Sequence, residues 1–76
     1  MINNYGVTMV PVSSSNVQSI GYDENTMALY VNFLNNALYI YKNVPKLEYD
    51  ELLRAPSIGS YLHRNIKAQY PYERIE

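Results

Sequence analysis

The stretch MALYVNFLNNALYIYK, residues 27–42, decides the fold. Apolar and polar side chains alternate along it on both sides of the pair Asn35-Asn36. Alternation is typical of a half-buried β-strand, and asparagine tolerates the left-handed backbone that a two-residue hairpin turn requires. The stretch therefore predicts two antiparallel strands joined by a tight turn at Asn35 and Asn36.

The position of this turn sets which side chains share a face of the hairpin. A two-residue turn places Phe33 opposite Leu38 and Val31 opposite Ile40, and residues directly opposite one another point to the same side of a sheet. One face is then aliphatic and predicts a core: Leu29, Val31, Phe33, Leu38 and Ile40. The other face is rich in phenols: Tyr30, Asn32, Tyr39 and Tyr41.

Further strands are expected before this hairpin. Residues 17–22, VQSIGY, predict the first strand of a three-stranded antiparallel meander, in which Gly21 indicates a bulge or a close backbone approach. Residues 8–12, TMVPV, are compatible with a fourth, short N-terminal strand. Because Pro11 cannot donate to a β-ladder, that strand would have to lie at the edge of the sheet.

After residue 42 the apolar period changes from two to about 3.6, which predicts helices. A first helix is expected over about residues 45–55, and Ser57 is a natural N-cap for a second helix that Pro71 prevents from continuing much beyond Tyr70. Strands followed by helices predict one α+β domain, residues 1–76, with two helices packed on the aliphatic face. Since two helices cannot cover both faces, we expect the tyrosine face to meet solvent, a ligand or another subunit. The aromatic tail, residues 70–75, is expected to dock on the domain.

Composition narrows the classes of function. A chain of 76 residues forms a thin core, yet it has no Cys and only one His, His63, which argues against disulfides and a zinc site. Self-association is the remaining means of support, so we expect a homo-oligomer. All six Lys and Arg lie in residues 42–76, but the net charge is −1. Such a weakly acidic charge argues against binding of long nucleic acid, which requires many contacts between cations and phosphates. With no signal peptide or long apolar run, the expected location is the cytoplasm, without membrane contact.

No arrangement typical of an active site is present. There is no Ser/His/Asp order, no phosphate-binding glycine loop and no histidine spacing suited to a metal. We therefore expect no enzyme, no metal and no cofactor.

Binding chemistry is better represented. The tyrosines of the phenol-rich hairpin face have three possible roles: Tyr30, Tyr39 and Tyr41 either stabilise cross-strand pairs or bury against the N-terminal segment, form a subunit interface, or stack on a base. The run of residues 13–16, SSSN, is either a plain turn or an anion cup built from Ser14, Ser15 and Asn16. Four basic side chains are candidates for phosphate contacts: Lys42, Arg64, Lys67 and Arg74.

Several short motifs, taken in order, resemble those of the KTSC domain family: S-S-N (14–16), I-G-Y-D (20–23), L-x-V-x-F (29–33), Y-x-Y (39–41), V-P (44–45), G-x-Y (59–61) and Y-P-Y-x-R-I (70–75). This family is named for its occurrence at the C-terminus of some lysyl-tRNA synthetases, and it also occurs as small stand-alone proteins in bacteria and phages. The resemblance covers about residues 11–75 and implies a binding role, with RNA suggested by the synthetase context. The chain departs from the family in its Asn-Asn-Ala hairpin loop, where Gly is common, and in its weakly acidic balance.

Together these features predict a non-catalytic, self-associating module for a phosphate-bearing ligand. A small nucleotide or a nucleotide signal is the expected ligand, which an oligomer of a phage or bacterial protein would sequester. An RNA-binding accessory module and a structural protein-contact domain remain as alternatives.

Overall fold

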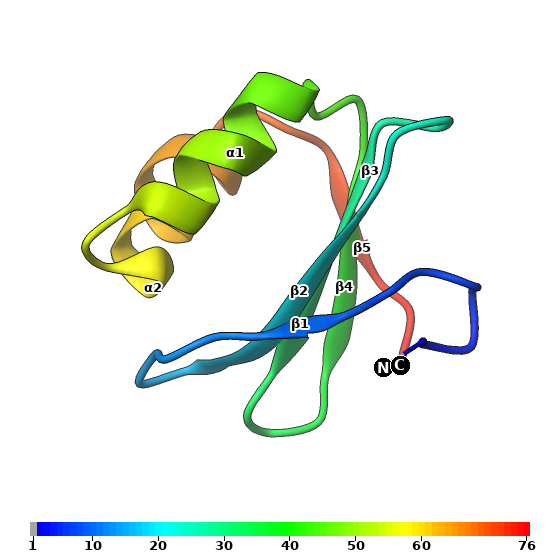
Figure 1. The fold of residues 1–76 in the computed structure, drawn as a ribbon, viewed down its shortest axis with the longest axis horizontal. Helices are drawn as coiled ribbons and strands as arrows, with labels where there is room; N and C mark the ends of the chain where they lie inside the picture. Colours follow the sequence, from blue (N-terminus) through cyan, green and yellow to red (C-terminus); the bar gives the residue numbers. More distant parts are fainter. Residues whose placement is uncertain (1) are drawn as a thin grey trace.

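The computed structural model describes residues 2–76, and its centre is a five-stranded antiparallel sheet (Figure 1). The strands follow one another in the sheet in the order of the sequence: β1 (Val10–Pro11), β2 (Val17–Asp23), β3 (Ala28–Phe33), β4 (Leu38–Tyr41) and β5 (Tyr72–Arg74). Three helical segments connect β4 to β5: α1 (Lys46–Arg54), α2 (Ile58–Tyr61) and the π-helix η1 (Leu62–Ile66), which continues α2. The expected α+β class and the helix regions are confirmed.

The sheet has more strands than the sequence predicts. The N-terminal strand is present, and Pro11 lies on the outer edge as expected. The tail docks, as expected, but it does so as a strand, because the backbone of residues 72–74 pairs with β4. Three exposed residues after a proline carry no alternating pattern, so the sequence gives no strand signal there.

The predicted register of the central hairpin is wrong by one residue. Asn32, and not Phe33, lies opposite Leu38, and Val31 lies opposite Tyr39. The loop contains three residues, 34–36, because the Phe33 amide donates to the Ala37 carbonyl oxygen at 2.8 Å. Asn36 takes the left-handed conformation with φ of 68°, which suits the last residue of such a loop.

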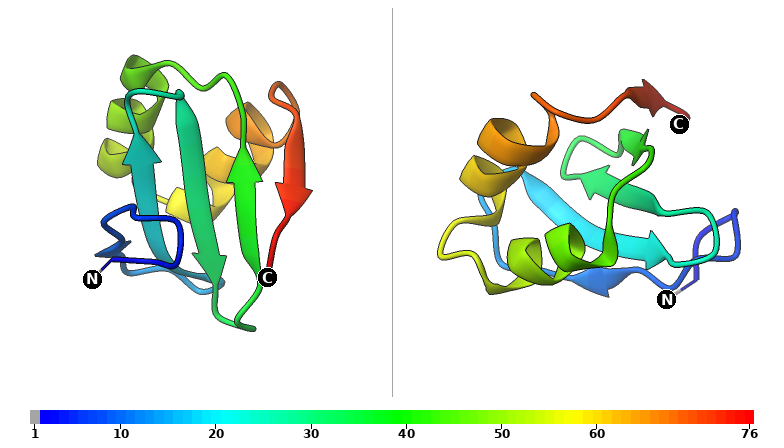
Figure 2. Two further views of the ribbon diagram at one scale, coloured as in Figure 1. Left: turned by 90° about the vertical axis from the view of Figure 1, so that its right-hand side faces the viewer. Right: turned by 90° about the horizontal axis from the view of Figure 1, so that it is seen from above.

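A slip of one residue in register moves side chains to the opposite face of a sheet. Tyr39 and Tyr41 therefore share a face with Leu29, Val31 and Phe33, and this face is the one that the helices cover (Figure 2). Tyr41 is only 2% exposed and belongs to the same buried cluster as Leu52, Leu62 and Ile66. The expectation that these tyrosines face away from the helices is thus wrong.

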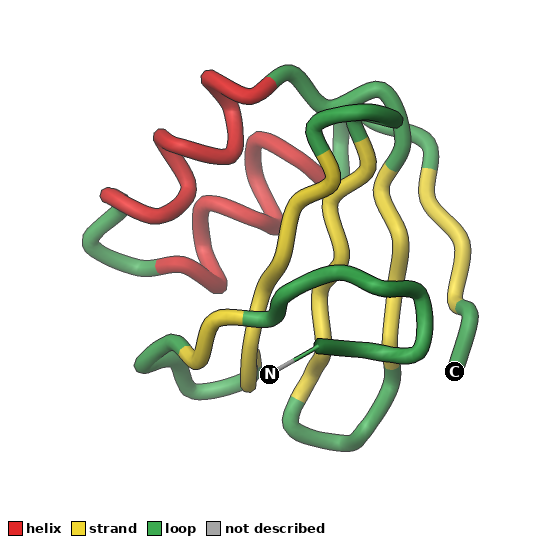
Figure 3. The backbone as a smooth tube through the Cα atoms, turned by 45° about the vertical axis from the view of Figure 1, so that its right-hand side comes forward, coloured by secondary structure: helices red, strands yellow, loops and turns green. Residues whose placement is uncertain are grey.

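The other face of the sheet is covered as well. The N-terminal segment runs across it (Figure 3), and Val7 and Met9 pack there against Ala28, Tyr30 and Leu38. Gly21 lets this segment approach, because a Cβ at that position would lie 2.6 Å from the Thr8 carbonyl oxygen. The close approach expected at Gly21 is confirmed, whereas the uncovered tyrosine face is not found.

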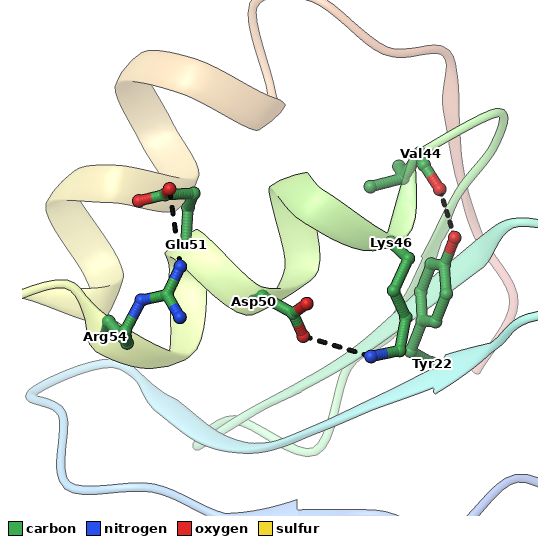
Figure 4. Close-up of polar contacts among 6 residues, drawn as sticks. All are labelled: Tyr22, Val44, Lys46, Asp50, Glu51 and Arg54. Carbon is green, nitrogen blue, oxygen red and sulfur yellow. Dashed lines mark hydrogen bonds and ion pairs between the residues drawn. The ribbon is translucent and has the colours of Figure 1, made fainter.

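Around α1 the polar groups are paired with one another (Figure 4). The Tyr22 hydroxyl donates to the Val44 carbonyl oxygen, and Lys46 pairs with Asp50 at 3.1 Å. On the next turn Arg54 contacts Glu51 at 3.4 Å. The second helical segment begins at its expected N-cap, since the Ser57 hydroxyl accepts the Ser60 amide. Within residues 2–76, no helix has the length and apolar character needed to cross a membrane.

Candidate functional site

A cleft of about 480 Å³ opens on the helix-covered side, between the tip of the β3–β4 hairpin, the α2–η1 segment and β5. Five separate parts of the chain line it: the loop before β2, the hairpin, β4, the helical segment and β5. The α1 helix contributes none of the lining residues. The cleft therefore lies at the end of the sheet that α1 leaves open.

Four rings, which we call the aromatic cluster, line this cleft: Phe33, Tyr39, Tyr41 and Tyr72. Phe33 meets Tyr39 edge-on with ring centroids 5.4 Å apart, and Tyr39 lies 6.4 Å from Tyr41 in a stacked arrangement. Tyr72, from β5, lies 5.9 Å from Tyr39 and 5.4 Å from Tyr41. The tail strand thus completes a continuous aromatic surface, and Tyr72 remains 46% exposed.

The phenol of Tyr41 stays neutral, and the tyrosine hydroxyls of this cluster have no hydrogen-bond partner among the described residues. Burial raises the pKa of Tyr41 to about 12, with smaller contributions from the neighbouring Tyr72 and Tyr39. No described residue hydrogen-bonds to the hydroxyl of any of these three tyrosines, although no side-chain polar atom among the described residues is both buried and unpaired. The hydroxyl of Tyr41 therefore has access to the cleft and can hydrogen-bond to a ligand.

The charged side chains that line the cleft are cationic. Lys67 and Arg74 contribute to the lining together with His63, and no carboxylate side chain of the described residues does so. Three other cations of the chain are paired: Lys42 with Glu73, Lys46 with Asp50 and Arg54 with Glu51.

Lys67 and Arg74, by contrast, have no carboxylate side chain as a partner within the described residues. Arg74 Nε donates to the main-chain oxygen of Glu76 at 3.0 Å, which leaves its two terminal nitrogens available. Lys67 follows the π-helix, and its amide donates to the Leu62 carbonyl oxygen at 2.8 Å. Such π-helical turns are frequent at functional sites.

The loop before β2 forms one rim of the cleft and is held in place by local contacts. The Ser14 hydroxyl accepts the amides of Asn16 and Val17, so Ser14 shapes the loop while Ser15 and Asn16 line the cleft. The Leu34 amide donates to the Asn16 carbonyl oxygen at 2.9 Å and joins this rim to the hairpin. A side chain at position 59 would collide with Asn16, because a Cβ there would lie 2.6 Å from Asn16 Oδ1.

The structure brings most of the candidate binding residues together. Six of the nine line the cleft: Ser15, Asn16, Tyr39, Tyr41, Lys67 and Arg74. Ser14 supports the rim, Lys42 is paired with Glu73, and Arg64 does not line the cleft. Sequence reasoning missed Tyr72, although the Y-P-Y of the tail marked it. It placed Phe33 on the core face, where it does pack, but did not identify it as a lining residue of the cleft.

These features define a small α+β domain with an aromatic, cationic cleft at one end of its sheet. The chain belongs to the KTSC domain family, whose sequence model matches residues 13–70. A crystal structure of a KTSC domain protein from Yersinia pestis has the same fold, with a TM-score of 0.88 and 31% sequence identity over 92% of this chain and 99% of that chain.

Relatives in sequence are of two kinds. The chain is 40% identical over 68 residues to an uncharacterized protein of Stutzerimonas stutzeri (strain A1501), a match that covers 88% of this chain and 96% of that protein. It is also 36% identical over 59 residues to a lysine–tRNA ligase of Nostoc sp. (strain PCC 7120). That second match covers 78% of this chain but only 10% of the ligase.

Proposed function

We propose that this KTSC domain is a non-catalytic module that binds a small phosphate-bearing nucleotide in the cleft. The observation that carries the proposal is the joint placement, around one cavity, of an aromatic cluster and of two cations that have no carboxylate side chain as a partner within residues 2–76. Its volume of about 480 Å³ falls within the range of about 300–1,000 Å³ that is usual for small-ligand sites.

The base of the ligand stacks on the aromatic cluster. Tyr72 and Tyr39 offer ring surface at the edge of the sheet, and stacking of a base on an aromatic side chain contributes about 1–3 kcal/mol. Tyr41 lies deeper and contributes a neutral hydroxyl, because the pKa of its phenol is raised to about 12.

The phosphate is held by Lys67 and Arg74. Tyr39 and Arg74 lie directly opposite one another in the β4–β5 pair, so their side chains share one face of the sheet. A nucleotide with its base over Tyr39 therefore has its phosphate within reach of a planar guanidinium, which binds phosphate oxygens in a bidentate manner. Two cationic side chains are enough to contact a ligand with one or two phosphate groups. A module without a reaction of its own holds such a ligand and lowers its free concentration.

An RNA-binding role is the second candidate, and the likeness to a segment of a lysine–tRNA ligase favours it. The two candidates differ in their dependence on salt. Each phosphate contact to single-stranded nucleic acid contributes a slope of about −0.7 to the logarithm of the affinity against the logarithm of salt concentration. A nucleotide held by two cations gives a shallow slope, whereas extended RNA that contacts many phosphates gives a steep one.

A thermal-shift screen of nucleoside mono- and diphosphates tests the proposal. A ligand at 100 times its dissociation constant stabilises a protein by about 2.7 kcal/mol, which corresponds to more than 10 °C for a domain of this size. We expect at least one nucleotide to reach this shift, and the double variant Lys67→Gln/Arg74→Gln to lose it. The matched control Lys46→Gln removes a cation that is already paired with Asp50, and it should keep the shift. A screen without any stabilising nucleotide would refute the proposal.

The expected homo-oligomer stays a prediction. It rests on the thin core of a short chain without cysteines, and a subunit contact through an open tyrosine face does not support it, because the N-terminal segment covers the face opposite the helices.

A further inference from the structure

We propose that the cleft selects nucleotides whose base carries a carbonyl oxygen at C6 of a purine or C4 of a pyrimidine, namely guanine, hypoxanthine or uracil, over adenine and cytosine, which carry an amino group at that position. This inference rests on the proposed nucleotide-binding function and specifies the class of ligand. It follows from the hydrogen-bond polarity of the two asparagines that line the cleft, Asn16 and Asn35.

The amide of Asn16 is oriented by its neighbour. Ser14 Oγ accepts the backbone N–H groups of Asn16, at 3.4 Å, and of Val17, at 3.3 Å. With both acceptor positions of the hydroxyl used, its own hydrogen donates to Asn16 Oδ1 at 3.1 Å. This bond fixes the orientation of the amide and uses one of the two acceptor positions of its oxygen. The NH₂ group of Asn16 has no acceptor among the described residues and remains available as a donor.

The amide of Asn35 is oriented in the same sense by the backbone. Asn35 Oδ1 accepts the Ala37 backbone N–H at 3.1 Å. A backbone N–H is a donor only, so the amide oxygen has to face it and the NH₂ group has to point away. No described residue accepts a hydrogen bond from this NH₂ group. Each of the two rims therefore carries a lining residue whose NH₂ group is available as a donor.

No acidic side chain of the described residues balances these side-chain donors. Lys67 and Arg74 are donors only, and within the described residues no Asp, Glu or Gln lines the cleft. Ser15 and the phenols can turn their hydroxyls either way, and the neutral form of an imidazole such as that of His63 has one donor and one acceptor nitrogen. A ligand rich in acceptors satisfies the site, whereas a ligand amino group leaves the two amides without a partner, and an unpaired polar group in a desolvated site lowers affinity.

The bases divide on this criterion. At C6 guanine presents a carbonyl oxygen and adenine an amino group, while N7 is an acceptor in both. At C4 uracil, like thymine, presents a carbonyl oxygen and cytosine an amino group. Hypoxanthine differs from adenine by the carbonyl at C6 and the N1 hydrogen that accompanies it. Uracil likewise differs from cytosine by the carbonyl at C4 and the hydrogen on N3. Each pair has one size and one phosphate charge, so a difference in affinity within a pair reports hydrogen-bond polarity.

Calorimetric titration with inosine monophosphate against AMP, and with UMP against CMP, tests the inference on the unchanged protein. We expect the carbonyl member of each pair to bind about tenfold more tightly. Equal affinities within each pair would overturn the base selection while leaving the nucleotide-binding proposal intact. An absence of binding by all four would also overturn the base selection, and the nucleotide-binding proposal falls with it if the wider screen of mono- and diphosphates finds no ligand.

The variant Asn35→Asp assigns the selection to a named group. Aspartate keeps an acceptor for the Ala37 amide but replaces the NH₂ donor by a second acceptor. We expect this variant to lose most of the tenfold preference. The control Asn36→Asp adds the same charge one residue away, at a position that does not line the cleft, and should keep the preference. Retention of the preference in Asn35→Asp would contradict the role assigned to this amide.

Discussion

The two ends of the helix-covered face use the same kinds of side chain in different ways. At the α1 end the Tyr22 hydroxyl donates to the Val44 carbonyl oxygen, and the Tyr22 ring stacks on Tyr49 with centroids 5.0 Å apart. Lys46 and Arg54 have carboxylate partners there (Figure 4). At the η1 end, the phenols of the aromatic cluster and the cations Lys67 and Arg74 have no such partners within the described residues.

This difference separates groups that serve the fold from groups that serve a ligand. A polar group that finds a partner inside the domain contributes to stability, and removal of that partner costs free energy. A polar group that lines a cleft without a partner contributes little to stability and is available for binding. The following predictions test this division, from the largest expected effect to the smallest.

The packing of α1 on the sheet should contribute most to stability. Leu52 is fully buried in the main cluster, so Leu52→Ala should lower the free energy of unfolding by about 2–5 kcal/mol. Leu53, one position further along the helix, is 41% exposed, and Leu53→Ala should cost well under half as much. Urea unfolding of both variants measures the difference. Equal losses would show that α1 does not close this end as described.

Stability should fall at alkaline pH through the buried phenol of Tyr41. Its pKa is near 10 in the unfolded chain and about 12 in the folded domain, so the unfolded state loses this proton first as the pH rises. The phenol stays protonated in both states below pH 10, and its contribution is lost between about pH 10 and 12, by about 2.7 kcal/mol. Tyr41→Phe should remove this part of the alkaline decline. An unchanged decline in that variant would contradict the assignment.

Removal of a tyrosine hydroxyl at neutral pH should lower the free energy of unfolding at the α1 end but not at the η1 end. Tyr22→Phe leaves the Val44 carbonyl oxygen without its donor and should cost about 1 kcal/mol. Tyr39→Phe removes a hydroxyl that has no partner among the described residues, and it should change stability by less than about 0.5 kcal/mol. Thermal and urea unfolding of the two variants provide the comparison. A larger loss for Tyr39→Phe would reverse the division between the two ends.

The smallest effect is expected for the cleft cations. Lys67→Gln should leave the free energy of unfolding within about 0.5 kcal/mol of the original, because no carboxylate among the described residues loses a partner. Asp50→Asn breaks the pair with Lys46 and should cost up to about 0.5 kcal/mol, as is usual for exposed pairs on a helix. Clear destabilisation by Lys67→Gln would show that this lysine has a structural role.

The types of the site residues could be predicted from the sequence better than their surroundings. Tyr39, Lys67 and Arg74 follow from their chemistry, and they line one cleft as candidates for one ligand should. The face of the sheet on which Tyr39 and Tyr41 lie could not be predicted. One extra residue in the hairpin loop moves the side chains of β4 to the opposite face. Asn-Asn is compatible with a loop of two or of three residues, and only tertiary packing distinguishes them.

The part played by the termini was harder to predict. The cover provided by residues 2–9 depends on the close approach at Gly21, which the sequence indicated without identifying the segment that approaches. Strand β5 depends on backbone pairing by three exposed residues, which leaves no periodic trace. Tyr72 lines the cleft because of this pairing, whereas the sequence predicted only that it belongs to a docked tail.

Amide chemical-shift changes on titration with a nucleotide test the central claim most directly. With inosine monophosphate added to the ¹⁵N-labelled protein, we expect the largest changes in four segments around the cleft: residues 15–16, 34–39, 59–67 and 72–74. Amides of residues 22–26 and 44–54, at the α1 end, should change little. Changes concentrated on α1 or on the N-terminal segment, or spread evenly over the domain, would contradict the assignment of the cleft as the binding site.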